Sequence, residues 1–138
     1  MGNETLAEVV VKKLIEKRLT LATAESCTGG LLAERITRIP GSSQTFRGGF
    51  IPYTKWAKKT LGIPTYLLDY GDVSLEIAES LARMAKEKFS SDIGIGITGN
   101  AGPSQGDTSK PVGYVCISVV NNSSAISRDF QLEGDRER

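Results

Sequence analysis

Helical and strand-like segments alternate along most of this chain, and their order restricts the fold more than any other feature of the sequence. The predicted helices cover residues 5–18, 28–39, 55–61 and 74–89. The predicted strands are "LTLATAE", "FRGGFIPY", "DIGIGIT" and two segments near residues 112–120 and 124–132, which form a hairpin. This order predicts an α/β fold, a three-layer α/β/α sandwich with a mixed, mostly parallel sheet, built as a single domain over residues 1–138.

Capping and breaking residues mark several of the predicted boundaries. Thr5 and Glu8 have the spacing of a capping box at the start of the first helix. Ser74 is a candidate N-cap for the helix with the longest apolar stripe. Pro52 predicts that the strand before it lies at an edge of the sheet or ends there.

The charge balance, the cysteines and the apolar stretches of the sequence argue against several classes of protein. The 17 basic and 16 acidic side chains nearly cancel, so the chain lacks the basic excess of a protein that binds nucleic acid without sequence preference. Cys27 and Cys116 form no CxxC pair, which favours a reducing, cytoplasmic setting over a zinc ribbon or a disulfide scaffold. The apolar stretch "VVVKKLI" is interrupted by two lysines, so we expect no signal peptide and no membrane segment.

The absence of histidine limits the chemistry that the chain can perform. A chain with no histidine has no Ser-His-Asp triad, no imidazole base and no histidine-bound metal. Proton transfer would therefore have to use lysine, a carboxylate, tyrosine or cysteine.

The segment "ATAESCTGG" is the first candidate site, because it joins a predicted strand to a predicted helix. The free backbone N–H groups of Thr28, Gly29 and Gly30 would lie beside the Ser26 hydroxyl and could hold an oxyanion or a phosphate. The alternative is that Ser26 or Thr28 only caps the helix. Cys27 is a rival nucleophile, but no cationic partner is visible nearby, and a small apolar role is the stronger interpretation.

Two further segments supply candidate polar groups. "YTKWAKKTLG" contains Tyr53 and three lysines at the start of a short helix, and spacing alone does not separate Lys58 from Lys55 or Lys59. "TGNAGP" could bring backbone amides to an anion, with a plain turn as the alternative. Lys110 and Arg136 are candidate phosphate contacts, or solvated charges.

Several spaced motifs then form a pattern that covers about residues 5–138. They are "TAESCTGGLLAERIT", "PGSS", "FRGG", "PYTKWAK" followed by "LG", "VS", "DIGIGITGNAGP", "KPVG" and "GDRE". Taken together, they resemble the C-terminal domain of the CinA (competence/damage-inducible) family, whose single-domain members are PncC-type nicotinamide mononucleotide deamidases. The resemblance implies a metal-independent amidohydrolase without a cofactor, which releases nicotinic acid mononucleotide and ammonia in pyridine-nucleotide recycling.

The resemblance also implies roles for individual residues. Ser26 would be the nucleophile, Lys58 its base and Tyr53 an assisting group. The positions assigned to substrate binding are Thr28, Gly29, Gly30, Arg47, Thr98, Gly99, Ala101, Gly102, Lys110 and Arg136. The expected partner is the mononucleotide substrate, and we expect no binding of nucleic acid or of a membrane. The sequence does not decide between a monomer and a homo-oligomer.

The sequence departs from the family pattern at a few positions. Thr54, Lys55 and Trp56 replace the central residues of the usual "YSNEAK", Asn100 stands where an aliphatic residue is usual, and residues 104–107 are poorer in glycine. The family's final helix after "GDRE" is expected to be missing. Trp56 and the altered loop favour an alternative function, a catalytically silent module that binds a nucleotide or a partner, whereas the intact Ser26, Tyr53 and Lys58 favour the enzyme.

Overall fold

The computed structural model describes residues 4–69, 71, 73–100 and 111–133. Its strands are β1 (Leu21–Glu25), β2 (Phe46–Phe50), β3 (Ile93–Gly99), β4 (Tyr114–Val120) and β5 (Ala125–Gln131). Its α-helices are α1 (Leu6–Lys17), α2 (Leu31–Thr37), α3 (Lys55–Thr60), α4 (Thr65–Leu68) and α5 (Leu75–Phe89), with a 3-10 turn η1 (Ser42–Gln44). The predicted α/β class is therefore confirmed.

The five strands form one mixed sheet in the order β2-β1-β3-β4-β5. β1 runs parallel to both of its neighbours, whereas β3–β4 and β4–β5 are antiparallel. The expectation of a mostly parallel sheet was thus wrong, since only two of the four pairings in the described chain are parallel. The reason is that parallel neighbours need a crossover connection, and in the described segments helices intervene only before β2 and β3.

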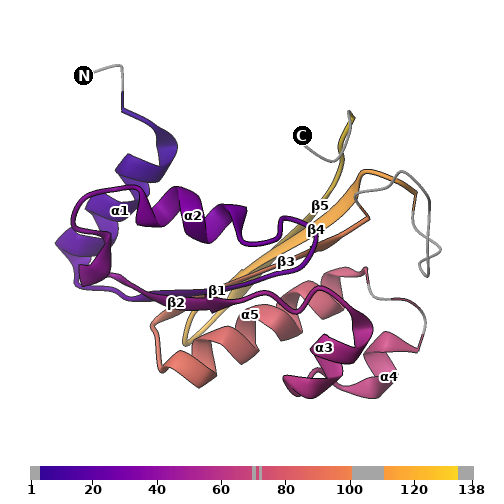
Figure 1. The fold of residues 1–138 in the computed structure, drawn as a ribbon. Helices are drawn as coiled ribbons and strands as arrows, with labels where there is room; N and C mark the ends of the chain where they lie inside the picture. Colours follow the sequence, from indigo (N-terminus) through magenta and orange to yellow (C-terminus); the bar gives the residue numbers. More distant parts are fainter. Residues whose placement is uncertain (1–3, 70, 72, 101–110, 134–138) are drawn as a thin grey trace.

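Helices lie on both faces of the sheet, with α1 and α2 on one face and α3, α4 and α5 on the other (Figure 1). β1 supplies alternate side chains to both faces, as the period of two in a strand requires. Leu21 packs in the apolar cluster of α1 and α2, while Ala22 and Ala24 pack in the cluster of α5. Every residue of β1 is buried.

The glycines of β3 allow α5 to approach the sheet closely. A Cβ atom added at Gly94 or Gly96 would lie 2.1 Å from a backbone carbonyl oxygen of α5, that of Ala82 or Ala78 respectively. The alternation in "DIGIGIT" therefore places glycine on the face that α5 covers and isoleucine on the other.

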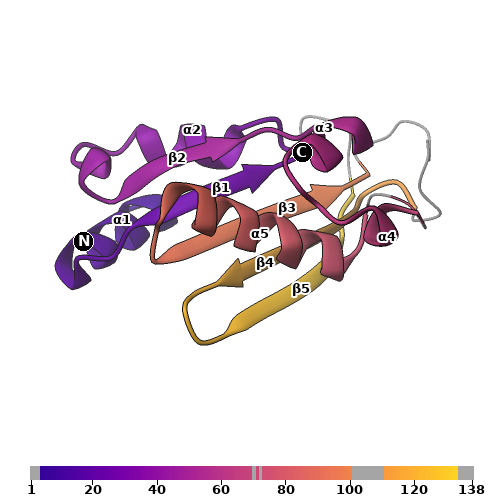
Figure 2. The ribbon, with the colours of Figure 1, turned by 90° about the horizontal axis from the view of Figure 1, so that it is seen from below.

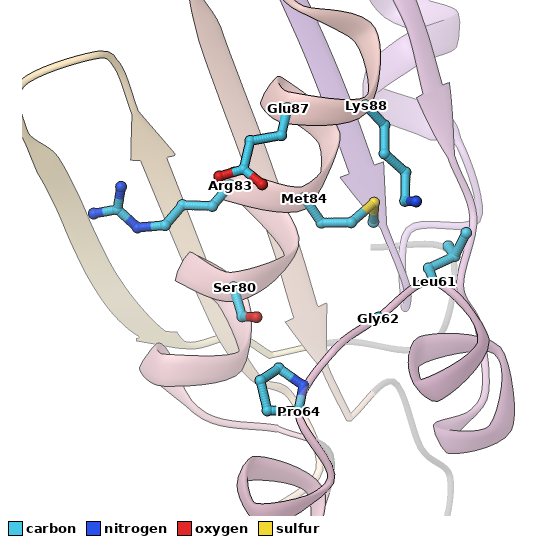
Figure 3. Close-up of a pocket in the computed structure, with 8 residues that line it drawn as sticks. All are labelled: Leu61, Gly62, Pro64, Ser80, Arg83, Met84, Glu87 and Lys88. Carbon is cyan, nitrogen blue, oxygen red and sulfur yellow. The ribbon is translucent and has the colours of Figure 1, made fainter.

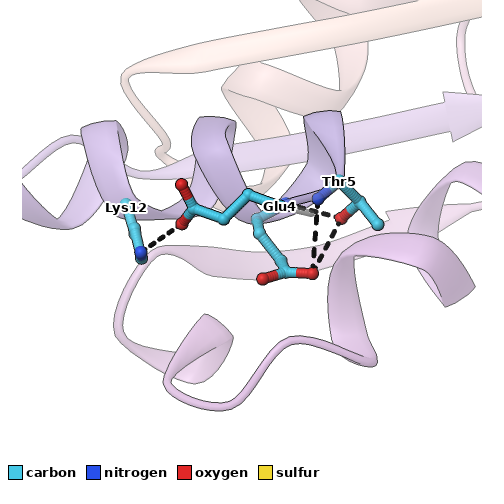
Figure 4. A network of polar contacts seen from close by, with 4 residues as sticks. Glu4, Thr5 and Lys12 are labelled. Atoms are coloured by element: carbon cyan, nitrogen blue, oxygen red, sulfur yellow. Dashed lines mark hydrogen bonds and ion pairs between the residues drawn. The ribbon is translucent and has the colours of Figure 1, made fainter. Parts of the chain in front are cut away.

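The predicted caps are present where the helices begin. Thr5 and Glu8 form the capping box of α1, next to an ion pair between Glu4 and Lys12 (Figure 4). The Ser74 hydroxyl accepts a hydrogen bond from the Ile77 N–H group, 3.0 Å long, at the start of α5. Within the described part of the chain, every helix is too short or too polar to cross a lipid bilayer.

Candidate active site

Ser26 directly follows β1, at the edge of the sheet where the parallel strands β1 and β3 end. Its N–H group donates a 3.0 Å hydrogen bond to the carbonyl of Ile97 in β3. The helix α2 begins five residues later, at Leu31. Figure 2 shows α3 beside this end of β1. Ser26 therefore lies at the end of a strand, as predicted, although the helix begins later than residue 28.

The structure brings Lys58 to Ser26. The Lys58 Nζ atom donates a hydrogen bond of 3.2 Å to the Ser26 Oγ atom. Lys58 is 0% exposed and Ser26 4% exposed, so both groups are removed from water. Lys55 is only half-buried and Lys59 is exposed. The fold thus distinguishes one lysine among the three that the helical spacing left open.

The backbone on either side of Lys58 is held independently of Ser26. Thr54 caps α3, since its hydroxyl accepts a 3.1 Å hydrogen bond from the Ala57 N–H group. The carbonyl of Lys58 itself accepts a 3.0 Å hydrogen bond from the Ile63 N–H group. Both contacts fix the direction in which the lysine side chain enters the protein.

Tyr53 reaches Ser26 through its backbone. Its carbonyl oxygen lies 3.5 Å from the Ser26 Oγ atom and accepts a hydrogen bond from it, whereas the residue as a whole is 51% exposed. The Ser26 hydroxyl is therefore placed between a donor, Lys58, and an acceptor, Tyr53. This arrangement orients the oxygen lone pairs of the serine.

Cys27 has the properties of a protonated thiol. Burial raises its pKa, and the nearby positive charge of Lys58 lowers that pKa by less than burial raises it. An added Cβ at Gly99 would lie 2.9 Å from the Cys27 Sγ atom, so the thiol packs against the end of β3. At neutral pH this side chain is a poor nucleophile, because the thiolate is the reactive form.

The glycine turn differs from the expected cradle of three free amides. The Gly29 N–H group donates a 3.1 Å hydrogen bond to the carbonyl of Ser26, within the turn itself. Gly30 is the N-cap of α2 and has a φ of 101°, a left-handed conformation that favours glycine. A role for Thr28 and Gly30 in holding an anion stays a prediction.

A carboxylate that the sequence analysis did not single out caps α2. Glu25 accepts hydrogen bonds from the N–H groups of Leu32 (2.8 Å) and Ala33 (2.9 Å) and from the Thr28 hydroxyl (2.7 Å). The alternative interpretation, that Ser26 or Thr28 only caps the helix, does not hold, because the Thr28 hydroxyl donates to Glu25 and Ser26 faces Lys58. The sequence did contain one signal for the role of Glu25, since it is an acidic residue at the end of an otherwise uncharged strand.

Of the other predicted contacts, two lie close to Ser26. Glu25 pairs with Ile97, so the next residues, Ser26 and Thr98, are lateral neighbours, and Thr98 is fully buried. Gly99 ends β3 beside them. Arg47 does not join this group, since it lies near the start of β2, at the opposite end of the sheet, where its Nη1 donates to the Phe89 carbonyl. Ala101, Gly102, Lys110 and Arg136 lie outside the described residues.

A separate hollow of about 290 Å³ lies between α5 and the turn that joins α3 to α4 (Figure 3). Its walls hold none of the predicted site residues. It is lined by Leu61, Gly62, Pro64, Ser80, Arg83, Met84, Glu87 and Lys88. Among the described residues, no group of three or more acidic or cysteine side chains is placed to bind a metal ion.

Comparison with known proteins gives consistent matches over nearly the whole chain. The model of the CinA C-terminal domain family matches residues 3–138. A CinA-like protein of Prochlorococcus marinus subsp. pastoris is 49% identical over 120 residues, which are 86% of this chain and 28% of that protein. A CinA-like protein of Dictyoglomus turgidum is 40% identical over 139 residues, which are 99% of this chain and 34% of that protein. The chain spans about a third of the length of these curated relatives.

Solved structures have the same fold. A CinA superfamily protein from Escherichia coli superposes with a TM-score of 0.89 at 31% identity, over 96% of this chain and 78% of that one. The competence/damage inducible protein CihA from Agrobacterium tumefaciens superposes with a TM-score of 0.85 at 35% identity, over 91% of this chain and 78% of that one.

Proposed function

Because this chain belongs to the CinA C-terminal domain family, we propose that it is an amidohydrolase that deamidates nicotinamide mononucleotide. The proposal assigns the attack to Ser26 and proton transfer to Lys58. The single observation that carries it is the 3.2 Å contact between the Lys58 Nζ and Ser26 Oγ atoms, which belong to two buried residues. A nucleophile and its base need to lie within hydrogen-bond reach of each other.

The reaction would proceed through an ester with the enzyme. The attack requires the form of the enzyme in which Lys58 is neutral and the Ser26 hydroxyl has turned from the Tyr53 carbonyl to the lysine amine. Lys58 then accepts the hydroxyl proton while the Ser26 oxygen attacks the carboxamide carbon, and backbone N–H groups of the turn stabilise the oxyanion. The C–N bond then breaks, and the proton on Lys58 leaves with the nitrogen as ammonia. Water, deprotonated by the same lysine, cleaves the ester to give nicotinic acid mononucleotide and to restore the serine hydroxyl.

The placement of Tyr53 and Trp56 fits this proposal. The Tyr53 carbonyl holds the serine hydroxyl in place, and the Tyr53 side chain is exposed enough to meet a substrate that enters from outside. Trp56 is 75% exposed and does not fill the space between the serine and the lysine. The departure from the family pattern at this position therefore leaves the pair intact.

Ammonia release from nicotinamide mononucleotide by the purified chain tests the proposal. We expect turnover by the wild type and a loss of at least about 10²-fold in Ser26→Ala and Lys58→Met, since serine is a weak nucleophile without its base. The double variant should be little worse than either single one, because the two residues act as a unit. Lys59→Met is the matched control and should keep wild-type activity, since Lys59 is exposed.

Two outcomes would contradict the proposal. Substantial turnover by Ser26→Ala would show that another group makes the attack. Calorimetric binding of the mononucleotide by an inactive wild type would instead favour the silent binding module.

A further inference from the structure

Glu25 is a buried acidic residue with a full set of partners, and the proposed mechanism does not use it. It is 1% exposed. Its Oε1 atom accepts hydrogen bonds from the Thr28 hydroxyl and the Leu32 N–H group, and its Oε2 atom accepts one from the Ala33 N–H group. A buried carboxylate is tolerated only when such donors replace water.

These contacts join two elements across the turn that carries Ser26. Glu25 is the last residue of β1, and its partners Leu32 and Ala33 lie in the first turn of α2. Helix α2 has no side-chain cap at Gly30, so Glu25 supplies the acceptor that the first amides of the helix need. The carboxylate therefore holds both ends of residues 26–30 in place.

The alternation of side chains along β1 separates this contact from the proposed chemistry. Glu25 points to the face of the sheet that carries α2, and Ser26 points to the face that carries α3, where it meets Lys58. The two residues share one peptide group. Because the backbone at Lys58 is anchored by Thr54 and Ile63, any shift of that peptide would change the distance from Ser26 to Lys58.

We propose that Glu25 is a positioning residue, whose carboxylate fixes the Ser26 hydroxyl at its distance from Lys58. This inference rests on the proposed function, since it concerns the rate of the same reaction. It also implies that the Leu32 and Ala33 amides serve Glu25 and not the phosphate of a substrate.

The variant Glu25→Gln tests the inference with the least change of shape. Glutamine has one acceptor oxygen and one NH2 group in place of two acceptor oxygens. At least one of the three groups that donate to Glu25 would then face the NH2 group and lose its hydrogen bond. We expect kcat to fall at least about ten-fold while KM stays within about three-fold, because misplacement of a reacting group slows the chemical step. Glu25→Asp keeps the charge but has a shorter reach, and we expect an intermediate kcat.

Asp92→Asn is the matched control, because Asp92 is also a carboxylate that accepts from a backbone N–H group and a threonine hydroxyl. Its partner is Thr20, near the start of β1 and far from Ser26. We expect this variant to lose stability but to keep the wild-type kcat. An equal fall of kcat in Glu25→Gln and Asp92→Asn, or unchanged kcat in both Glu25 variants, would overturn the inference.

Amide hydrogen exchange provides a readout that does not depend on the substrate. The quantity to compare is the exchange rate of three amides, those of Gly29, Leu32 and Ala33, divided by the exchange rate of the β1 amides. This ratio should rise in Glu25→Gln and should stay at its wild-type value in Asp92→Asn. Unchanged exchange at these three amides would refute the positioning role even if the wild type proved inactive. An inactive wild type with faster exchange in Glu25→Gln would refute the proposed function alone.

Discussion

The two potential nucleophiles of this chain, Ser26 and Cys27, are neighbours in sequence but differ in their surroundings. Ser26 is held between Lys58 and the Tyr53 carbonyl, so its oxygen stays within hydrogen-bond reach of the lysine. Cys27 packs against the end of β3, and burial raises its pKa. The residue with the lower intrinsic reactivity is thus the better placed one.

The raised pKa of Cys27 gives a prediction for its pH dependence. The thiol should react slowly with iodoacetamide near pH 7.5, and its rate should rise only above the ordinary cysteine pKa of about 8.5. Lys58→Met should move this rise to still higher pH, because the lysine charge lowers the thiol pKa. Mass spectrometry of the Cys27 peptide after timed labelling measures both effects.

Fast labelling of Cys27 at pH 7 would contradict the assignment of a protonated thiol. Cys116 serves as the internal control, since it is 0% exposed and should be labelled only when the protein unfolds.

The arrangement of the candidate site residues could be predicted from the sequence only in part. Ser26 was found because its motif joins a strand to a helix, but Lys58 was separated from Lys55 and Lys59 only by family resemblance. Periodicity shows which residues share a helix face, but it does not show how that helix is turned toward β1. Glu25 was missed because its partners are backbone amides, which leave no trace in side-chain patterns.

At the scale of elements, the contact between α5 and β3 depends on the missing side chains of two glycines. Gly96→Ala should reduce the free energy of unfolding by about 1–3 kcal/mol, because its Cβ would meet the Ala78 carbonyl oxygen at 2.1 Å and the backbone must move. Urea unfolding followed by circular dichroism measures the loss. Gly62→Ala is a useful comparison, since no atom lies within 4 Å of its added Cβ.

We expect Gly62→Ala to cost less, about 1 kcal/mol, which reflects its φ of 96° and not a collision. Equal losses in the two variants would show that α5 can move away from β3 without penalty.

A second element contact links the start of β3 to the start of β1. Two hydrogen bonds from Thr20 lower the pKa of Asp92. The larger effect comes from the Thr20 backbone N–H group and the smaller one from its hydroxyl. A carboxyl group whose pKa is lower in the folded state stabilises the fold above its unfolded pKa of about 3.9, and this stability is lost as the pH falls through the folded value. Unfolding free energies of the wild type should therefore drop below about pH 4.

Asp92→Asn should be less stable than the wild type at neutral pH and should show a shallower fall below about pH 4, because the titrating group is gone. Urea titrations at several pH values compare the two slopes. Parallel curves would mean that Asp92 contributes nothing to acid unfolding.

The elements themselves were largely predictable, and the exceptions have physical causes. Strong apolar periods and caps located α1 and α5, and the Gly-Ile alternation located β3. The start of α2 was misplaced because its cap comes from β1 and not from the turn. The four-residue α4 and the turn η1 are too short to produce a periodic signal.

At the scale of the whole molecule, the proposed catalytic pair joins a central strand to a peripheral helix. β1 is bonded to β2 and β3 on its two sides, whereas α3 has six residues and lies outside the sheet (Figure 2). Short helices open more easily than central strands. We expect urea to abolish the proposed ammonia release at a lower concentration than it abolishes the far-ultraviolet circular dichroism signal.

Coincident midpoints for activity and circular dichroism would show that α3 unfolds only together with the sheet. Amide exchange offers a check on the same point, since the amides of α3 should exchange faster than those of β1.

Glu25 is the last residue of β1 and Ser26 is the residue directly after it, so the alternation of side chains along the strand decides which of the two faces Lys58. A single inserted or deleted residue earlier in β1 would turn the carboxylate toward Lys58 and bury the serine beneath α2, while leaving the composition of the strand almost unchanged. Two such changes would restore the arrangement. Over evolutionary time, this segment should therefore tolerate exchanges of one apolar residue for another far better than any change in its length.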